Sequence, residues 1–303
     1  MSIFQKKYEI TQGDFGPHIC LYSGWSRDVE KVIKRKGVLE LELNYAKGWP
    51  RGSDLSFLAD LTQLKSFELL DYKVSDISVI NKLSELSSLK INANCNNVID
   101  FPNFPHLQRI SIEWFPNAES LFRCYTLRRV FINCCDIKSL SVFEKLGDIE
   151  YLSLKSPQLE CIGQMNMLNK LVFLGIYNAK NLQSLEGVQQ FPNLEMLEIE
   201  RCKKISNITA VESLKKLRRF MIANCGDIDS LRPLADLREL REVFFHESTN
   251  VRDGDLQPLK LLPRLEVVSF QERKHYNLTR KDFGQDYPDD IRELFKYPKK
   301  YGI

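Results

Sequence analysis

The pattern LxxLxL recurs through most of this chain and constrains its fold more than any other feature of the sequence. Eleven registers align, with an apolar residue at each of the three defining positions, and successive registers begin 20 to 26 residues apart. A period of this length, repeated so often, predicts a solenoid built from equivalent units. The registers begin at Val38, Leu64, Leu86, Leu107, Leu127, Ile149, Leu171, Leu194, Leu217, Leu240 and Leu265.

The spacing within each unit predicts a short strand followed by a return segment. If the first residue of LxxLxL is position one, positions four and six lie on the same face of a strand, because strand side chains alternate. A second apolar set follows, as in Ile228, Leu231 and Leu234 of the ninth unit. One unit cannot bury this apolar edge alone, so neighbouring units must stack and share a continuous core.

The extended pattern LxxLxLxx(N/C)xL resembles the short class of leucine-rich repeats, about 22 residues long, such as those of protein-phosphatase regulatory subunits and bacterial internalins. Here the N/C position, position nine, is occupied by Asn94, Cys135, Cys202 and Cys225. The resemblance covers roughly residues 38–270. It implies an α/β repeat solenoid: a leucine-rich-repeat horseshoe with a concave parallel β-sheet of about 11 strands, a mixed helical and extended convex side, and a cap at each end. It says little about activity, because one fold hosts many functions.

The return segments differ along the chain. Units three to six contain Pro102, Pro105, Pro116 and Pro157, which favour extended or turn conformations over helix. Units eight and nine, with ESLKKL and PLADLREL, are expected to return through more helical segments.

Residues 1–37 are expected to form an N-terminal cap, because a solenoid needs polar-faced ends. Ser26 can cap a helix over residues 27–36, whose first turn is acidic and last turn basic, and Gly37 can end it. Trp25 can pack as a hydrophobic staple on the following turn.

Residues 271–303 lose the period and are expected to form a C-terminal cap or tail. The sequence DDIRELF predicts a short helix at 289–295. Aromatic residues are frequent in this segment, namely Tyr276, Phe283, Tyr287, Phe295, Tyr297 and Tyr301.

Composition excludes several classes of protein. The 303 residues have a formal net charge of +3, which argues against a dedicated binder of nucleic acid or anionic membranes. The chain contains neither a signal-like apolar segment near Met1 nor a run long enough to span a membrane. The eight cysteines form no CxxC pair and are expected to be free thiols. These features predict a cytoplasmic protein.

Known catalytic motifs are absent from the sequence. The four histidines form no HExxH, and GxSxG, GxxxxGK and GxGxxG do not occur. We therefore predict no enzymatic activity, no cofactor and no metal. Cys135, Cys202 and Cys225 are expected to be buried and inert. Cys134 is the only thiol with a plausible chemical role, so the alternative is a thiol-dependent enzyme or an enzyme-regulatory subunit.

The outward strand positions predict where a partner binds. The first three units present polar residues there, namely Glu40, Glu42, Asn44, Glu68, Asp71, Lys90 and Asn92. Later units present large apolar residues and His246, namely Trp114, Phe131, Tyr151, Phe173, Tyr177, Met196, Met221, Phe244 and His246. Arginines surround these, namely Arg109, Arg128, Arg129, Arg218, Arg219 and Arg241, with Glu198 and Glu200 between them.

Aromatic residues, methionine and arginine are enriched at the centres of protein interfaces. The primary hypothesis is therefore a non-catalytic protein–protein interaction module that binds a protein or peptide on its concave face, as an inhibitor, an immunity-type protein or a regulatory protein. The arginines make an acidic partner a corollary. An extracellular, internalin-like adhesin is a third hypothesis, and the oligomeric state stays open.

Overall fold

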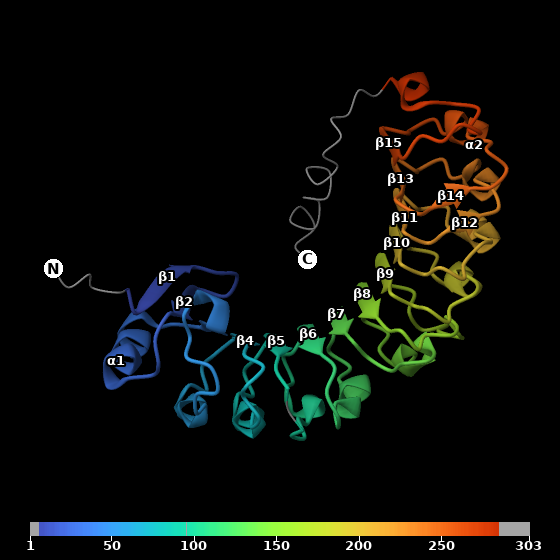
Figure 1. Cartoon of the computed structure of the whole chain (residues 1–303). Coiled ribbons are helices and arrows are strands. Elements are labelled where there is room, and N and C mark those ends of the chain that lie inside the picture. The colour runs from blue at the N-terminus through green and yellow to red at the C-terminus, as the bar shows by residue number, and fades with distance from the viewer. Residues whose placement is uncertain (1–5, 95, 285–303) are drawn as a thin grey trace.

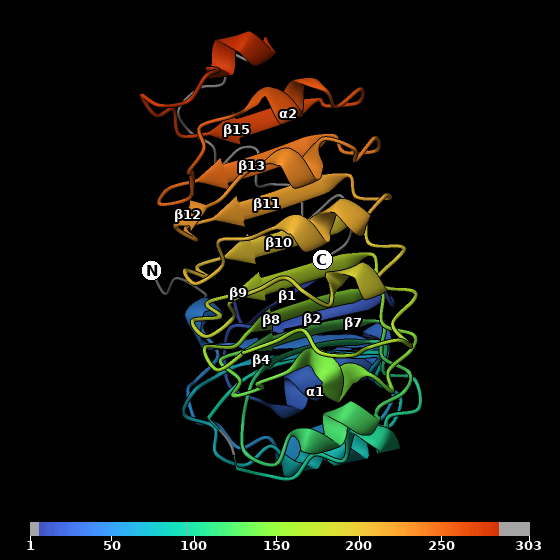
Figure 2. The same cartoon turned by 90° about the vertical axis from the view of Figure 1, so that its right-hand side faces the viewer.

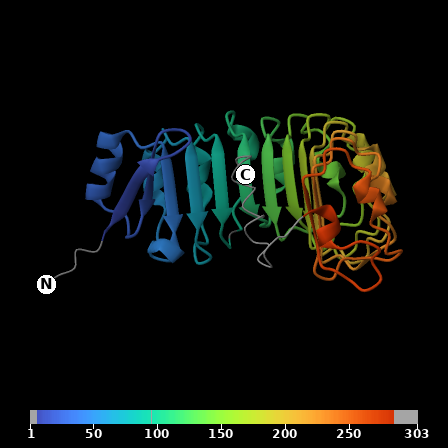
Figure 3. The same ribbon diagram turned by 90° about the horizontal axis from the view of Figure 1, so that it is seen from above.

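The computed structural model describes residues 6–94 and 96–284. Within them the chain forms a curved solenoid, with one long sheet on its inner side and short helical turns on its outer side (Figure 1). Seen from above, the strands lie side by side along the arc (Figure 3). The sheet has 13 strands, and consecutive strands pair in parallel except for the antiparallel first pair. The expected leucine-rich-repeat horseshoe is therefore confirmed.

Eleven of these strands come from the eleven registers, and each begins at position three of its unit. The strands of the sheet are β1 (Tyr8–Gln12), β2 (Pro17–Leu21), β3 (Glu40–Asn44), β4 (Ser66–Leu70), β5 (Ser88–Asn92), β6 (Arg109–Glu113), β7 (Arg129–Asn133), β8 (Tyr151–Lys155), β9 (Phe173–Tyr177), β10 (Met196–Glu200), β11 (Arg219–Ala223), β13 (Glu242–His246) and β15 (Val267–Phe270). A small second sheet on the convex side pairs β12 (Asp227–Ile228) with β14 (Asn250–Val251).

Positions one, four and six of the registers form the core. In the sixth unit Ile149, Leu152 and Leu154 are completely buried, and the same positions are buried in the other units except for the partly buried Leu265. Stacked units therefore exclude water from a continuous apolar column between the sheet and the return segments.

The N-terminal segment contributes two strands that the repeat pattern did not predict. β1 and β2 form a hairpin, and β2 pairs in parallel with β3. Ile19 and Leu21 of β2 are buried against the first repeat, so the hairpin covers the end of the core.

The predicted N-terminal helix is confirmed as α1 (Arg27–Lys36). The Ser26 hydroxyl accepts a hydrogen bond from Val29 N at 3.4 Å, and Gly37 ends the helix in the left-handed conformation at φ 58°. Trp25, however, stacks on Phe57 of the next return segment, with ring centroids 3.9 Å apart. This contact joins the N-terminal segment to the first repeat.

The return segments are more alike than predicted. Short 3₁₀ helices occur in most units: η1 (Tyr45–Lys47), η2 (Ser56–Asp60), η3 (Ser78–Lys82), η4 (Phe101–Asn103), η5 (Glu119–Arg123), η6 (Leu140–Phe143), η7 (Val188–Gln190), η8 (Thr209–Ser213) and η9 (Arg232–Leu234), with one α-turn, α2 (Gln257–Lys260). Figure 2 shows several of them from the outer side. The expected contrast with units eight and nine is wrong for units three to five, because a proline is compatible with a first helical turn, as Pro102 is in η4. It holds for unit six, which contains Pro157. Between β8 and β9 the return contains no helix.

Small buried side chains hold the corner that follows the strand in several units. Cys202 N donates to Cys225 Sγ at 3.4 Å, and Cys225 N donates to Thr249 Oγ1 at 3.0 Å. Cys135 is buried as well, which confirms the predicted burial of these three thiols. Asn94 is instead exposed, because Ala93 occupies the buried place in its unit.

The C-terminal segment closes the other end of the core as far as residue 284. Tyr276 and Phe283 contact Phe270 edge-on, with ring centroids 5.9 and 6.3 Å apart, and η10 (Arg280–Phe283) follows β15. The helix predicted at 289–295, with Tyr287, Phe295, Tyr297 and Tyr301, lies outside the described residues. Over residues 6–94 and 96–284, no helix is long and apolar enough to cross a membrane.

Candidate functional site

Three rows of side chains cover the concave face, because positions three, five and seven of each strand alternate with the core positions. The parallel register places equivalent positions of neighbouring strands opposite one another. We call position five the middle row. From β3 to β15 it reads Glu42, Glu68, Lys90, Ser111, Phe131, Ser153, Gly175, Glu198, Met221, Phe244 and Ser269.

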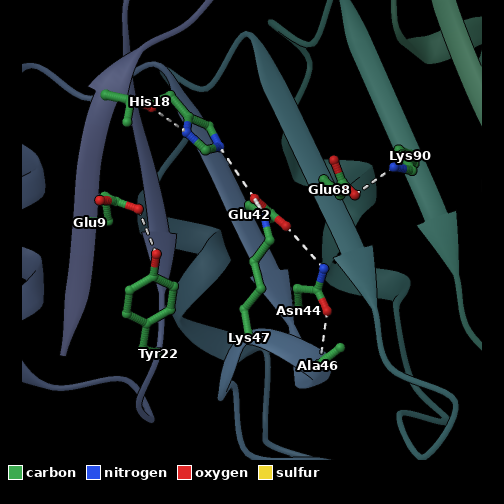
Figure 4. Close-up of polar contacts among 10 residues, drawn as sticks. Glu9, His18, Tyr22, Glu42, Asn44, Ala46, Lys47, Glu68 and Lys90 are labelled. Carbon is green, nitrogen blue, oxygen red and sulfur yellow. Dashed lines mark hydrogen bonds and ion pairs between the residues drawn. The ribbon is translucent and has the colours of Figure 1, made fainter. Parts of the chain in front are cut away.

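The polar N-terminal part of this face forms an internal network (Figure 4). The Glu42 carboxylate accepts hydrogen bonds from Lys47 Nζ at 2.8 Å and Asn44 Nδ2 at 3.0 Å, and His18 Nε2 lies 3.9 Å away. Burial raises the pKa of Glu42, but the hydrogen bonds from Lys47 and Asn44 outweigh it and the net shift is downward. The Glu42 carboxylate in this part of the face therefore already has its hydrogen-bond partners within the chain.

The turn between β1 and β2 reaches toward β6. Phe15 N donates to the Glu40 carboxylate at 2.6 Å, and the Asp14 carboxylate forms an ion pair with Arg109. The Arg109 guanidinium also lies 5.4 Å from the centre of the Phe15 ring. Residues 95 positions apart in sequence thus meet on the concave face.

A hollow of about 340 Å³ lies beyond this turn, over β5 to β9. The described residues that line it include three cations, Lys90, Arg109 and Arg129, and no carboxylate. The lining residues are Ser88, Leu89, Lys90, Arg109, Ile110, Ser111, Arg129, Val130, Phe131, Tyr151, Ser153 and Phe173. We call this set the central hollow.

Phe131 is the most exposed large apolar side chain in the central hollow. It is 39% exposed and stands between Ser111 and Ser153 in the middle row. Next to it, the Tyr151 and Phe173 rings stack with centroids 6.3 Å apart, and the Arg129 guanidinium lies 4.7 Å from the Tyr151 ring. The hollow exists because two serines flank a phenylalanine.

Four of the predicted partner-binding residues meet in this hollow: Arg129, Phe131, Tyr151 and Phe173. Ser111 and Ser153 were not predicted as site residues, since serine is depleted at the centres of protein interfaces. The signal was present as the alternation Ser111, Phe131, Ser153 along one row, but it becomes visible only when strand register is known.

The predicted residues closer to the C-terminus lie on the same face but are mostly buried. Met196, Arg219, Met221, Phe244 and His246 are each less than 10% exposed. Burial, followed by the charge of Arg280, lowers the pKa of His246 to about 4. These side chains pack tightly along the sheet.

Ion pairs and hydrogen bonds within the sheet engage the charged groups of this region. Arg219 lies 3.2 Å from Glu198 and 2.9 Å from Glu242, and Tyr177 donates to Glu198 at 2.8 Å. Burial and Glu198 raise the pKa of the Tyr177 hydroxyl. Arg219 is thus committed to glutamates of its own sheet, which makes it a poor candidate for binding an acidic partner.

Trp114 lies away from the central hollow. It follows the end of β6, and its ring stacks on Phe122 of η5 with centroids 5.8 Å apart. It packs partly buried against the core rather than beside Phe131.

Cys134 is exposed at the corner after β7. Burial and the nearby Glu113 carboxylate raise the pKa of its thiol, so the nucleophilic thiolate is disfavoured. In the described part of the chain, no group of three or more His, Cys, Asp or Glu side chains could hold a metal ion.

Comparison with known proteins gives a consistent result for the fold. No family model and no curated protein matches the sequence. Solved structures do match. An internalin of Listeria monocytogenes, InlF, is 20% identical over 78% of this chain and 73% of its own, with a TM-score of 0.56. A second Listeria internalin, InlC2, is 20% identical over 62% of this chain and 83% of its own, with a TM-score of 0.51.

A leucine-rich repeat protein of Leptospira interrogans is 14% identical, with a TM-score of 0.53, and the match covers 82% of this chain and 70% of that protein. Identities this low establish similarity of architecture alone. Together with the eleven buried registers, they show that this chain has the fold of the leucine-rich repeat proteins.

Proposed function

We propose that this protein is a non-catalytic interaction module that binds a protein partner in the central hollow. The observation that carries the proposal is the exposed Phe131 ring, which stands in a concave, cationic and aromatic surface. Exposed aromatic residues beside arginines are typical of the centres of protein interfaces. Similarity to other leucine-rich repeat structures is consistent with this use of the concave face.

The bound protein could be inhibited, neutralised as by an immunity protein, or regulated. The proposal covers all three roles, since each requires only tight binding of the partner. It favours these over the thiol-dependent alternative, because the raised pKa of Cys134 leaves that thiol protonated. We further propose a reducing compartment such as the cytoplasm. Eight cysteines in 303 residues, with no CxxC pair, are too few for a disulfide-stabilised scaffold.

Affinity capture with the full chain tests the proposal. Phe131→Glu places a charge in the hollow, and Val142→Glu is the matched control, because Val142 is also 39% exposed but lies in η6 on the convex side. We expect the wild type and the Val142 variant to retain the same partner and the Phe131 variant to lose it. Retention of that partner by a folded Phe131→Glu protein would show that the hollow is not the binding site.

A further inference from the structure

We infer that the turn between β1 and β2, residues 13–16, is a strap that closes the N-terminal end of the concave groove and opens by releasing one ion pair. The strap regulates how much of the concave face a partner can reach. This inference rests on the proposed function, because the state of the strap matters to binding only if a partner enters the central hollow.

The strap crosses the row of side chains at position three of the first four repeat strands. From β3 to β6 this row reads Glu40, Ser66, Ser88 and Arg109. The two ends of the row hold the strap, because Phe15 N donates to the Glu40 carboxylate at 2.6 Å and the Asp14 carboxylate forms an ion pair with Arg109. The two serines between these ends are small, so they leave room for the turn to pass over the sheet.

The row under the strap continues into the central hollow. Ser88 and Arg109 are the last two residues of the row and also line the hollow, whereas Ser66 does not line it. The hollow of about 340 Å³ is therefore the part of the groove that the strap leaves open. Lifting the strap would extend the groove from β5 toward β3 without any change in the sheet.

Phe15 binds to this groove instead of joining the core. Its side chain is half-buried, yet among the described residues it is not one of the partly buried apolar side chains that pack against the core. Its ring lies 5.4 Å from the Arg109 guanidinium. A ring held by a cation–π contact gives up less on leaving than a ring packed in the core does.

The two anchors of the strap differ in their exposure to water, which determines how it opens. The Glu40 side chain is 8% exposed, so its hydrogen bond to Phe15 N is protected, and we call this anchor the hinge. In the other anchor, the latch, 65% of the Asp14 side chain and 40% of the Arg109 side chain are exposed. An exposed ion pair is weak and is screened by salt. The latch therefore opens first, at the end of the strap that borders the hollow.

Thiol labelling with N-ethylmaleimide tests the strap in the full chain. Ser66→Cys places a thiol under the strap, and peptide mass spectrometry measures its labelling rate beside that of the exposed Cys134, an internal control in the same molecule. We expect Asp14→Asn, added to Ser66→Cys, to raise the labelling rate at position 66 about two- to fivefold and to leave that of Cys134 unchanged. An equal rate at position 66 with and without Asp14→Asn overturns the inference.

Ionic strength and a second ion pair distinguish the latch from general loosening. Raising sodium chloride from about 50 to about 500 mM should speed labelling at position 66 by a similar factor, but only while Asp14 is present. The matched control Lys170→Gln removes another exposed ion pair, with Asp148, and should leave the rate at position 66 unchanged. An increase in this control as large as in Asp14→Asn counts against the latch.

Hydrogen exchange shows whether the strap moves separately from the hairpin. In Asp14→Asn we expect faster exchange in residues 13–16, while β1 and β2 stay protected because they pair over five residues each. Equal loss of protection in the turn and in both strands would mean that the whole N-terminal hairpin detaches, which overturns the strap. Circular dichroism establishes that each variant is folded.

The outcome is separable from that of the proposed function. We expect folded Asp14→Asn to bind the captured partner about two- to fivefold more tightly than the wild type, since binding no longer includes opening the latch. Weaker binding would show that the turn belongs to the binding surface and would overturn the strap. If capture depends on Phe131 but labelling ignores Asp14→Asn, the interaction module stands and the strap is wrong. If labelling responds but capture does not depend on Phe131, the latch opens as inferred and the proposed function is wrong.

Discussion

The residue that follows the strand adopts a left-handed backbone conformation in several units, and only some of these residues are types that tolerate it well. Position eight has φ near 55° in five units; asparagine occupies it in two, at Asn178 and Asn224, and Cys134, Arg201 and Glu247 occupy it in the others. Asparagine tolerates this conformation better than other residues with a Cβ atom. We therefore expect Arg201→Asn to raise the free energy of unfolding by about 0.5–1 kcal/mol, measured by urea denaturation. The reverse change, Asn178→Arg, should lower it by a similar amount, and no change in either variant would refute the explanation.

A glycine on the concave face has a different role, because it makes room for a ring. A Cβ atom at Gly175 would lie 2.7 Å from Tyr177 Cε2 and 3.1 Å from Phe173 Cε1. We expect Gly175→Ala to displace the Tyr177 ring from Glu198 and to destabilise the protein by about 1–3 kcal/mol. Near-ultraviolet circular dichroism and urea denaturation measure both effects. Gly147→Ala is the control, where the nearest atom is 3.4 Å away, and an equal loss in both variants would contradict the crowding argument.

At the scale of the element, β13 carries a histidine that the fold keeps neutral. The pKa of His246 is lowered to about 4 from an ordinary value of 6.5, chiefly by burial. Since the unfolded chain binds the proton more readily, the contribution of His246 to stability is complete above pH 6.5 and is lost as the pH falls toward 4. We expect the free energy of unfolding to decrease over this range, and His246→Gln to flatten the decrease. Identical pH profiles for both proteins would exclude His246 as the cause.

The bounds of the repeat strands were predictable to within a residue, because positions one, four and six of every register identify the side chains that must be buried. The hairpin β1–β2 was not, since Ile19 and Leu21 become meaningful only when the open end of the first repeat is known. The short helices of units three to five were not predicted, because a single 3₁₀ turn needs little intrinsic helix propensity and tolerates proline at its start. Of the site, the large residues were predictable, whereas the flanking serines depend on neighbours 20 or more residues away.

At the scale of the whole molecule, each unit packs mainly on its neighbours, so stability is distributed along one dimension. A cavity in the middle should therefore have a different consequence from one at an end. Leu152 in β8 and Leu259 in α2 are both completely buried, and replacing either by alanine should cost about 2–5 kcal/mol locally.

Leu152→Ala weakens the link between two halves that each retain several repeats, so we expect its urea transition to broaden or split in two. Leu259→Ala should only fray the last units, and the main transition should keep its slope. Hydrogen exchange measured by mass spectrometry can follow the unfolding of the two halves separately, in the peptides of β3–β6 and β10–β13. If both variants shift a single sharp transition equally, the solenoid unfolds as one cooperative body. The ion pair between Asp14 and Arg109 joins the N-terminal hairpin directly to β6, past the strands between them. In that case we would expect this contact to contribute to the cooperativity of unfolding between units that are not neighbours.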